Sequence, residues 1–313
     1  MTLEPDYKIS LGEHVRRAFD QRAPIVALES TVIAHGLPYP LNLETAFECE
    51  RIITESGVTP ATVGLVDGLP TVGLNEDQIR AFAAGVAPDD TKIEKVGLNN
   101  LATVSVRRRW GATTVASSLK LAHQAGVRVF STGGIGGVHR GADQSFDVSN
   151  DLIALGDIPL ICVCAGAKAI LDLPKTVEYL ETLGVPILGY QTDELPAFYS
   201  RSSGLAVDAK VETAYEVAEI AYRHWSLGNR SAILLCVPVP GKEQIEASTI
   251  LPIIEEVVDL AAEKGIVGKA VTPFLLSEME RATDGRTVKA NLALLKNNAS
   301  VAALVAESLS KEF

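Results

Sequence analysis

The stretch Arg128-Val-Phe-Ser-Thr-Gly-Gly-Ile-Gly-Gly-Val-His-Arg-Gly141 runs from a short apolar segment into a loop with five glycines, a histidine and an arginine. Glycine has no Cβ, so the backbone N–H groups of such a loop can approach a ligand closely. In α/β proteins, a loop at the carboxyl end of a strand is also a common site for anionic small molecules. The stretch therefore predicts an α/β enzyme with a ligand site at this loop.

Strand-like and helix-like patterns alternate on both sides of this loop. Short apolar runs predict strands at residues 24–28, 62–66, 71–74, 127–130, 160–163, 185–188 and 232–237. Amphipathic patterns predict helices at residues 42–57, 113–126, 171–184, 211–228, 252–264, 273–282 and from 290 onward, with Asn42 and Asn75 as N-caps. Strands separated by helices favour a largely parallel sheet with both faces covered. Because no composition break or repeat divides the chain, we expect a single domain over residues 1–313.

Composition and charge exclude several classes of protein. A chain of 313 residues with 47% hydrophobic residues can bury a large core. Its formal charge of −11 gives no general attraction to nucleic acid or anionic lipid, so neither is an expected partner. Residues 1–10 contain two acidic residues and no apolar run typical of a signal peptide, and no stretch reaches the ~18 apolar residues of a membrane span. We therefore expect a cytoplasmic protein.

The four cysteines do not have the spacing of a zinc or redox site. Cys49, Cys162, Cys164 and Cys236 form no C-x-x-C pair, and three of them fall in strand-like runs. We interpret them as small buried hydrophobic residues.

Three polar residues follow predicted strands, where the carboxyl ends of a parallel sheet place ligands. They are Glu29, Thr132 and Lys168. A lysine that follows a buried strand in an Ala-Gly-Ala turn can be held as a neutral, nucleophilic amine. Two of these residues also have a structural interpretation: Glu29 as a solvated strand end or a capping acid, and Lys168 as a snorkelling or salt-bridged lysine.

The histidine of the loop and the acidic residues that follow it can likewise have either a functional or a structural role. His139 is either functional or an ordinary loop histidine, and Asp147 and Asp151 are either functional or helix N-terminal carboxylates. The loop lacks the G-x-G-x-x-G pattern of a dinucleotide site, because His139 stands where the third glycine would be. A nicotinamide enzyme is therefore disfavoured.

Eight motifs in chain order resemble the pseudouridine-5′-phosphate glycosidase family. They are Ala27-Leu-Glu-Ser-Thr-Val-Ile-Ala-His-Gly-Leu-Pro-Tyr-Pro40, Gly111-Ala-Thr-Thr-Val-Ala116, Thr132-Gly-Gly-Ile-Gly-Gly-Val-His-Arg-Gly141, Val163-Cys-Ala-Gly-Ala-Lys168, Ile170-Leu-Asp-Leu173, Gly189-Tyr-Gln-Thr192, Thr272-Pro-Phe-Leu-Leu276 and Lys296-Asn-Asn-Ala299. The resemblance implies a three-layer α/β/α fold and a homotrimer with one divalent metal per subunit, usually Mn²⁺. It also implies reversible chemistry on the carbon–carbon glycosidic bond between ribose 5-phosphate and uracil.

The family's site residues carry over to matching positions in this sequence. The resemblance implies that Glu29 is the proton donor, Lys168 the Schiff-base lysine and Asp147 the metal ligand. The implied substrate-binding residues are Lys95, Val115, Thr132, His139, Ser149, Asn150, Asp151 and Asn291.

A C-nucleoside has a carbon leaving group, which explains why these residue types are needed. Glu29 can protonate the ring oxygen and help open the ribose, after which a neutral Lys168 amine can add at C1′. The nitrogen lone pair then drives cleavage to an imine, which water hydrolyses. Lys95, the Thr132 loop and the Ser149 hydroxyl near a helix N-terminus are expected to hold the phosphate.

One segment departs from the family pattern. Family members usually have a basic-basic-acidic-Leu-Pro stretch after the position of Lys95, whereas this chain reads Lys95-Val-Gly-Leu-Asn-Asn-Leu-Ala102. If Leu98, Asn99 and Asn100 line the base pocket, the alternative function is a synthase that joins ribose 5-phosphate to an aromatic natural product, and arginines at Leu98 and Asn99 should favour uracil. A non-catalytic sugar-phosphate binding protein is the other alternative, and the retained Lys168, Glu29 and Asp147 argue against it.

Overall fold

A computed structural model of the chain describes residues 8–266 and 271–312. Residues 1–7 belong to the segment in which the sequence predicts no signal peptide, and they lie outside the described residues. The described strands are β1 (Ser10–Leu11), β2 (Ile25–Leu28), β3 (Thr59–Val66), β4 (Leu69–Val72), β5 (Glu94–Val96), β6 (Gly111–Thr113), β7 (Val129–Ser131), β8 (Ile161–Cys164), β9 (Ile187–Tyr190), β10 (Ala209–Val211) and β11 (Ile233–Cys236).

The helices connect and cover these strands. They are α1 (Glu13–Asp20), the π-helix η1 (Val32–Gly36), α2 (Leu41–Glu55), α3 (Glu76–Ala84), α4 (Leu101–Val106), α5 (Val115–Gln124), α6 (Ala142–Ser145), α7 (Asn150–Asp157), α8 (Leu173–Thr182), α9 (Ala214–Ser226), α10 (Ala247–Glu263), α11 (Val271–Ala282) and α12 (Arg286–Glu312).

The strands form one sheet in the order β1-β4-β3-β2-β7-β8-β11-β9-β10, with β6 paired to β3 and β5 paired to β6. Most neighbours are parallel, and only the β3–β4 and β3–β6 pairs are antiparallel among the described strands. The β3–β4 pair is a hairpin turned by Asp67 and Gly68, whose φ angles of 51° and 78° lie in the left-handed region. The predicted largely parallel sheet is confirmed.

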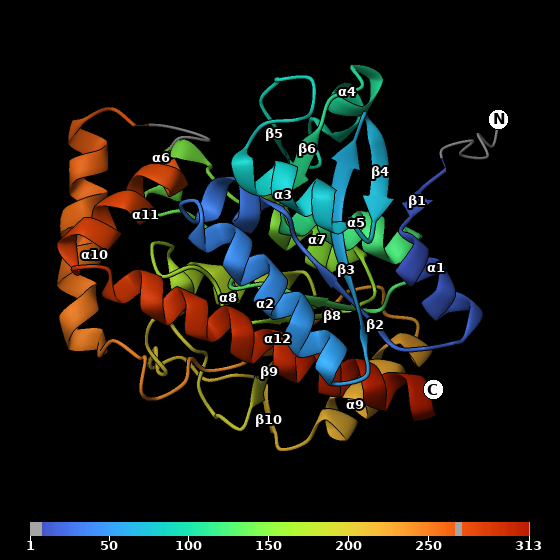
Figure 1. Ribbon diagram of the computed structural model, residues 1–313. Helices are drawn as coiled ribbons and strands as arrows, with labels where there is room; N and C mark the ends of the chain where they lie inside the picture. The colour runs from blue at the N-terminus through green and yellow to red at the C-terminus, as the bar shows by residue number, and fades with distance from the viewer. Residues whose placement is uncertain (1–7, 267–270, 313) are drawn as a thin grey trace.

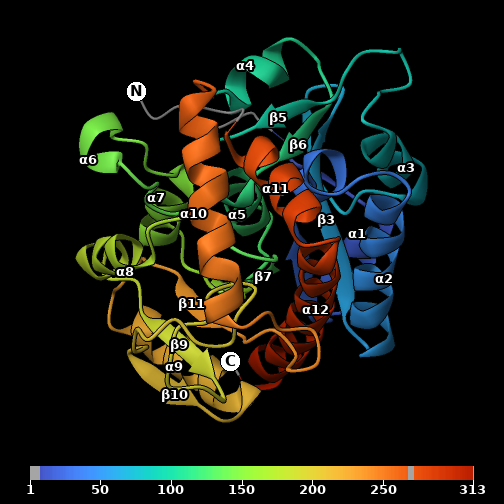
Figure 2. The ribbon, with the colours of Figure 1, turned by 90° about the vertical axis from the view of Figure 1, so that its left-hand side faces the viewer.

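Helices cover both faces of the sheet. In Figure 1, α2 and α12 lie in front of the sheet and α5 and α7 lie behind it. Figure 2 shows the same arrangement from the side, with α10 and α11 crossing one end of the molecule. The predicted α/β/α fold class is therefore confirmed.

Some element boundaries differ from the prediction. Asn75 caps α3 as expected, through a capping box with Gln78. The predicted cap at Asn42 is wrong, because Asn42 lies inside α2 and its buried amide donates to the carbonyl oxygens of Ile33 and Ala83. Residue 113 belongs to β6 and residue 211 to β10, because their backbones pair with neighbouring strands before the helical patterns begin.

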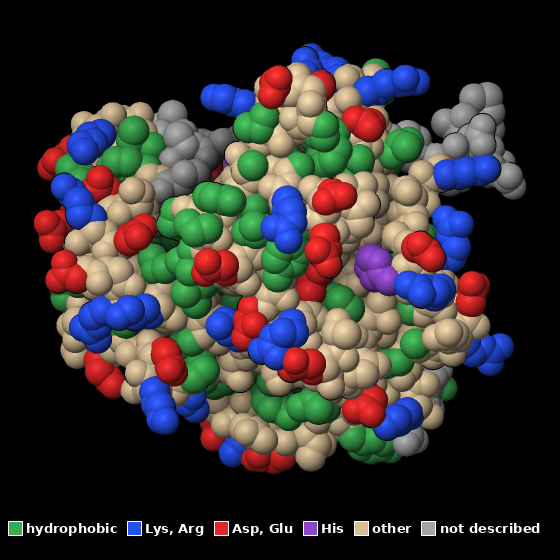
Figure 3. All heavy atoms as spheres, in the orientation of Figure 1, with side chains coloured by type: hydrophobic (Ala, Val, Ile, Leu, Met, Phe, Trp, Pro, Cys, Tyr) green, Lys and Arg blue, Asp and Glu red, His purple; other side chains and the backbone are tan. Residues whose placement is uncertain are grey.

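The interior and surface agree with the composition. All four cysteines are buried and unpaired, so the interpretation of them as hydrophobic core residues is confirmed. On the face in Figure 3, Lys and Arg side chains are mixed with Asp and Glu, and hydrophobic side chains gather where α2, α11 and α12 meet. No helix in the described part of the chain is long and apolar enough to cross a membrane.

Candidate active site

Three neighbouring parallel strands bring the main candidate residues to one edge of the sheet. Glu29 follows β2, Thr132 follows β7 and Lys168 comes four residues after β8. Because β2 pairs with β7 and β7 pairs with β8, all in parallel, their carboxyl ends lie side by side. The predicted placement at the ligand-binding edge of the sheet is therefore observed.

The glycine-rich loop is held against the segment that carries Lys168. The backbone N–H of Lys168 donates to the carbonyl oxygen of Ile135 (3.1 Å), and the N–H of His139 donates to that of Asp147 (3.0 Å). Gly136 is required by close approach, because a Cβ there would lie 2.2 Å from the Oγ atom of Ser149. The loop thus places residues from distant parts of the sequence around one cavity.

This cavity has a volume of about 310 Å³. The predicted site residues that line it are Glu29, Lys95, Val115, His139, Asp147, Ser149, Asn150, Asp151 and Lys168. Thr132 and Asn291 are not among the lining residues. Thr132 reaches the site through Glu29, whereas Asn291 lies on α12 with its amide oxygen beside Gly133.

Glu29 has the environment expected of a general acid. Its side chain is buried, and its Oε1 atom accepts a hydrogen bond from the Thr132 hydroxyl. Burial raises the pKa of the Glu29 carboxyl, although the nearby Lys168 charge and the Thr132 hydrogen bond oppose that shift. The acid form of Glu29 therefore persists to a higher pH than that of an exposed glutamate.

Asp151 fixes the geometry of the cavity wall. Its two carboxylate oxygens accept hydrogen bonds from the backbone N–H groups of Ala116 (2.9 Å) and Gly136 (2.8 Å). The side chain thereby joins the start of α5 to the glycine-rich loop. Ser149 caps α7 by accepting a hydrogen bond from the N–H of Asp151, as the expected helix N-terminus requires.

The donors around Asp147 can hold a metal ion only with help from water or substrate. The Asp147 side chain is 44% exposed, and its Oδ2 atom lies 3.9 Å from Nδ1 of His139. Burial and the Lys168 and Lys95 charges lower the pKa of His139 despite the opposing effect of Asp147, which favours a neutral ring. Among the described residues, no three His, Cys, Asp or Glu side chains are grouped as metal ligands. One carboxylate completed by water and substrate oxygens fits a hard divalent ion.

The segment after Lys95 contributes one side chain to the cavity. Asn99 lines it, whereas Leu98 is partly buried against the hydrophobic core. Asn100 stabilises the turn itself, since its side chain accepts from the N–H of Gly97 and donates to the carbonyl oxygen of Lys95. Of the three positions considered for an altered base pocket, only Asn99 faces the site.

Sequence reasoning did not assign a role to Asn298. Its buried amide donates to the carbonyl oxygen of Thr132 (2.8 Å), so α12 holds the backbone beside Glu29. The only sequence signal was its position in the Lys296-Asn-Asn-Ala299 motif.

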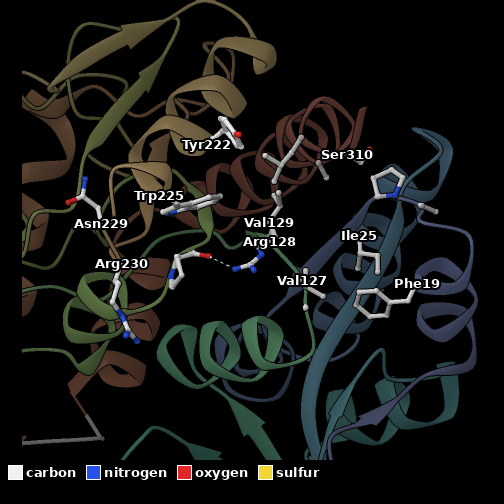
Figure 4. Close-up of a pocket in the computed structure, with 17 residues that line it drawn as sticks. Phe19, Ile25, Val127, Arg128, Val129, Tyr222, Trp225, Asn229, Arg230 and Ser310 are labelled. Atoms are coloured by element: carbon white, nitrogen blue, oxygen red, sulfur yellow. Dashed lines mark hydrogen bonds between the residues drawn. The ribbon is translucent and has the colours of Figure 1, made fainter. Parts of the chain in front are cut away.

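A second cavity, of about 580 Å³, lies at the opposite edge of the sheet. It is lined by the starts of β2 and β7, and Figure 4 shows Phe19, Tyr222 and Trp225 around it, with Arg128 bonded to the carbonyl oxygen of Pro159. None of the candidate site residues lines this cavity. Acid–base side chains are therefore concentrated at the carboxyl edge.

Comparisons with known proteins agree with this geometry. Pseudouridine-5′-phosphate glycosidases from Roseiflexus sp. and Geobacillus kaustophilus are 50% and 48% identical to this chain, over 99% and 96% of it and 99% and 98% of their own lengths. The one from Caldanaerobacter subterraneus is 46% identical over 97% of both chains.

Two solved structures share the fold. The prealnumycin C-glycosynthase in complex with ribulose 5-phosphate superposes with a TM-score of 0.89 at 35% identity, over 98% of both chains. An indigoidine synthase A-like protein from Thermotoga maritima gives a TM-score of 0.87 at 33% identity, over 97% of both. Residues 14–308 match the family described as indigoidine synthase A like protein. The chain therefore belongs to the indigoidine synthase A like family.

Proposed function

We propose that this protein is a pseudouridine-5′-phosphate glycosidase, which reversibly cleaves the carbon–carbon bond between ribose 5-phosphate and uracil through a lysine Schiff base. The observation that carries the proposal is the meeting of Glu29 and Lys168 at one cavity. Relatives of 46–50% identity over nearly the whole chain bear that activity in their names.

Ring opening is the first step that the site has to support. Glu29, kept protonated by burial, donates its proton to the ribose ring oxygen as the bond from that oxygen to C1′ breaks. The Lys168 amine attacks C1′ and forms a C–N bond, then loses a proton to become neutral again. The ring oxygen leaves as a hydroxyl group.

Cleavage of the carbon–carbon bond follows from this adduct. The nitrogen lone pair forms a C=N bond as the C1′–C5 bond breaks, and the uracil carbon takes up a proton. Water then adds to the imine and releases ribose 5-phosphate and the neutral amine. In the reverse direction the same groups join the sugar phosphate to uracil.

The remaining lining residues orient the substrate in this proposal. Lys95 and the N-terminus of α7 with Ser149 hold the phosphate, because the lysine is cationic and a helix N-terminus carries partial positive charge. Asp147 holds one Mn²⁺ ion per subunit, which would supply charge neutralisation and orientation when bound. Asn150 and His139 complete the polar wall.

Two further properties belong to the proposal. A homotrimer is supported by the hydrophobic side chains that gather where α2, α11 and α12 meet, since exposed apolar patches mark association surfaces. A cytoplasmic location is supported by the metabolic character of the proposed reaction. Light scattering would test the trimer.

The direct test is incubation of the purified protein with Mn²⁺ and pseudouridine 5′-phosphate, followed by mass spectrometry. Release of uracil and ribose 5-phosphate is the expected result. A parallel reaction supplies ribose 5-phosphate with uracil or with an aromatic acceptor such as a naphthoquinone. A product with the aromatic acceptor and none from either uracil reaction would contradict the proposal in favour of a C-glycosynthase.

A further inference from the structure

A small internal cavity lies behind Glu29, on the side away from the active-site cavity. Its volume is about 30 Å³, and its walls come from β2, β3, β7, η1, α2 and α12. Of all the residues that line either cavity in the described part of the chain, Glu29 alone lines both. The general acid therefore forms the partition between the substrate site and the internal cavity.

The internal cavity has room for a water molecule, and a few polar residues stand in its otherwise apolar wall. A site needs roughly 10–15 Å³ of this kind of volume and two to four polar partners for one water molecule. Glu29, Thr62 and Ser131 supply such groups at its wall. Thr62 is fully enclosed, and its hydroxyl can accept a hydrogen bond from water while it donates to a second group.

That second group is the carboxyl of Glu50, on α2. The Thr62 Oγ1 atom donates to Oε1 of Glu50 over 2.6 Å. The side chain of Glu50 is partly exposed, so it lies between the cavity wall and the protein surface. Glu50 thus extends the polar connection from the internal cavity to solvent.

The Glu50 carboxyl can change protonation state near neutral pH. Burial raises its pKa to about 7, the Thr62 hydrogen bond lowers it and the Glu76 carboxylate on α3 raises it. Glu76 lies 3.9 Å from Arg80 on its own helix. On α12, Lys296 faces Glu48 at 3.7 Å.

We infer that Glu50, Thr62 and water in the internal cavity form a proton path that connects Glu29 with solvent from behind. The inference rests on the proposed function, in which Glu29 gives up a proton while substrate fills the cavity in front of it. When Glu50 is protonated, its carboxyl hydroxyl can donate to Thr62, and the Thr62 hydroxyl then donates to water. In that arrangement, water gives a proton to the Glu29 carboxylate and takes the Thr62 hydroxyl proton. Thr62 takes the proton of Glu50, and Glu50 is reprotonated from solvent. Every step is a proton transfer along a hydrogen bond, and water, Thr62 and Glu50 each end with as many protons as they had at the start.

The kinetic test compares Thr62→Val with Thr62→Ser. Valine has the shape of threonine without a hydroxyl, so it interrupts the path, whereas serine restores the hydroxyl. We expect kcat to fall roughly tenfold in Thr62→Val, less than the loss of a direct general acid causes, and to recover within about twofold in Thr62→Ser. KM should stay unchanged, because Thr62 does not line the substrate cavity.

Glu50→Gln provides a second readout, with Glu48→Gln as its matched control. Glu48 lies on the same helix, but its carboxylate bonds to Arg51 and does not line the internal cavity. Protonated Glu50 can supply protons below its pKa of about 7 and not above it. The defect of Glu50→Gln relative to the parent should therefore be greatest below that pH and shrink above it, while Glu48→Gln follows the parent. An active parent whose Thr62→Val and Glu50→Gln variants keep the full kcat and pH profile would overturn the path.

A crystal structure of the protein tests the path without any substrate. We expect ordered water within hydrogen-bonding distance of both Glu29 and Thr62. A dry cavity in well-defined density would overturn the inference, whatever the enzyme acts on. Absence of turnover with pseudouridine 5′-phosphate by the parent protein would instead count against the proposed function, so the two failures are distinguishable.

Discussion

The two edges of the central sheet present cavities of opposite chemical character. The carboxyl-edge cavity of about 310 Å³ is lined by three carboxylates, two lysines and a histidine. The amino-edge cavity of about 580 Å³ is lined by aromatic and aliphatic groups, and its charged side chains are Arg128 and Arg230. Arginine stays protonated in proteins, so the two charged side chains of the larger cavity do not exchange protons near neutral pH. The comparison teaches that grouped titratable side chains, rather than volume, locate the reactive edge.

The largest effect should come from removing the proposed nucleophile, Lys168, at the carboxyl edge. Borohydride reduction with ribose 5-phosphate should trap a covalent adduct on Lys168, and Lys168→Ala should lose both the adduct and activity, by roughly 10⁴-fold or more. Peptide mass mapping identifies the modified lysine. Lys175→Ala is the control, since Lys175 pairs with Asp172 outside the cavity. An adduct on a different lysine would remove Lys168 from this role.

Glu29→Gln should have the next largest effect, a loss of ~10²–10⁴ in kcat, because an amide cannot donate the proton. Burial raises the pKa of Glu29, so activity of the parent that depends on the acid form should decline as the pH rises through that pKa. The glutamine variant should lack this decline. Stopped assays across pH, at saturating substrate, measure both. A variant with the parent's rate would show that another group is the acid.

The main effect of Asp147→Ala should be a loss of affinity for the metal ion. The carboxylate is the only anionic donor that the proposal gives the ion, so we expect Mn²⁺ binding to weaken at least ~10-fold. Titration calorimetry measures the affinity. Asp143→Ala is the control, because this exposed carboxylate faces Lys175 at 3.9 Å and does not line the cavity. Equal Mn²⁺ affinity in parent and Asp147→Ala would place the metal elsewhere.

The smallest effect should come from the amino edge. Arg230 lies 3.8 Å from Asp157, and both side chains are more than 70% exposed. Such surface pairs contribute about 0–1 kcal/mol to stability. Arg230→Ala should therefore leave kcat and KM unchanged and lower the melting temperature slightly, as calorimetry would record. A large loss of turnover would mean that the two edges of the sheet are coupled.

Local sequence patterns were sufficient for much of the fold. The capping box at Asn75 and the Asp67-Gly68 hairpin follow from short-range backbone chemistry, and both are observed. The prediction of an N-cap at Asn42 was wrong because its side-chain amide donates to the carbonyl oxygens of Ile33 and Ala83. No local sequence pattern reveals these partners. Likewise, helices were predicted to begin at residues 113 and 211, but both residues lie in strands because their backbones pair with distant segments.

The sequence by itself determined the α/β class and the alternation of the longer strands and helices, because periodicity and turn chemistry act over a few residues. It also identified Glu29 and Lys168 as residues that follow buried strands. Only the tertiary structure decided that the two carboxylate oxygens of Asp151 would accept from the N–H groups of Ala116 and Gly136. It also decided that, of Leu98, Asn99 and Asn100, only Asn99 would line the cavity. It also placed Thr62 and Glu50 behind Glu29. These contacts join residues far apart in the chain, and their partners are fixed by packing.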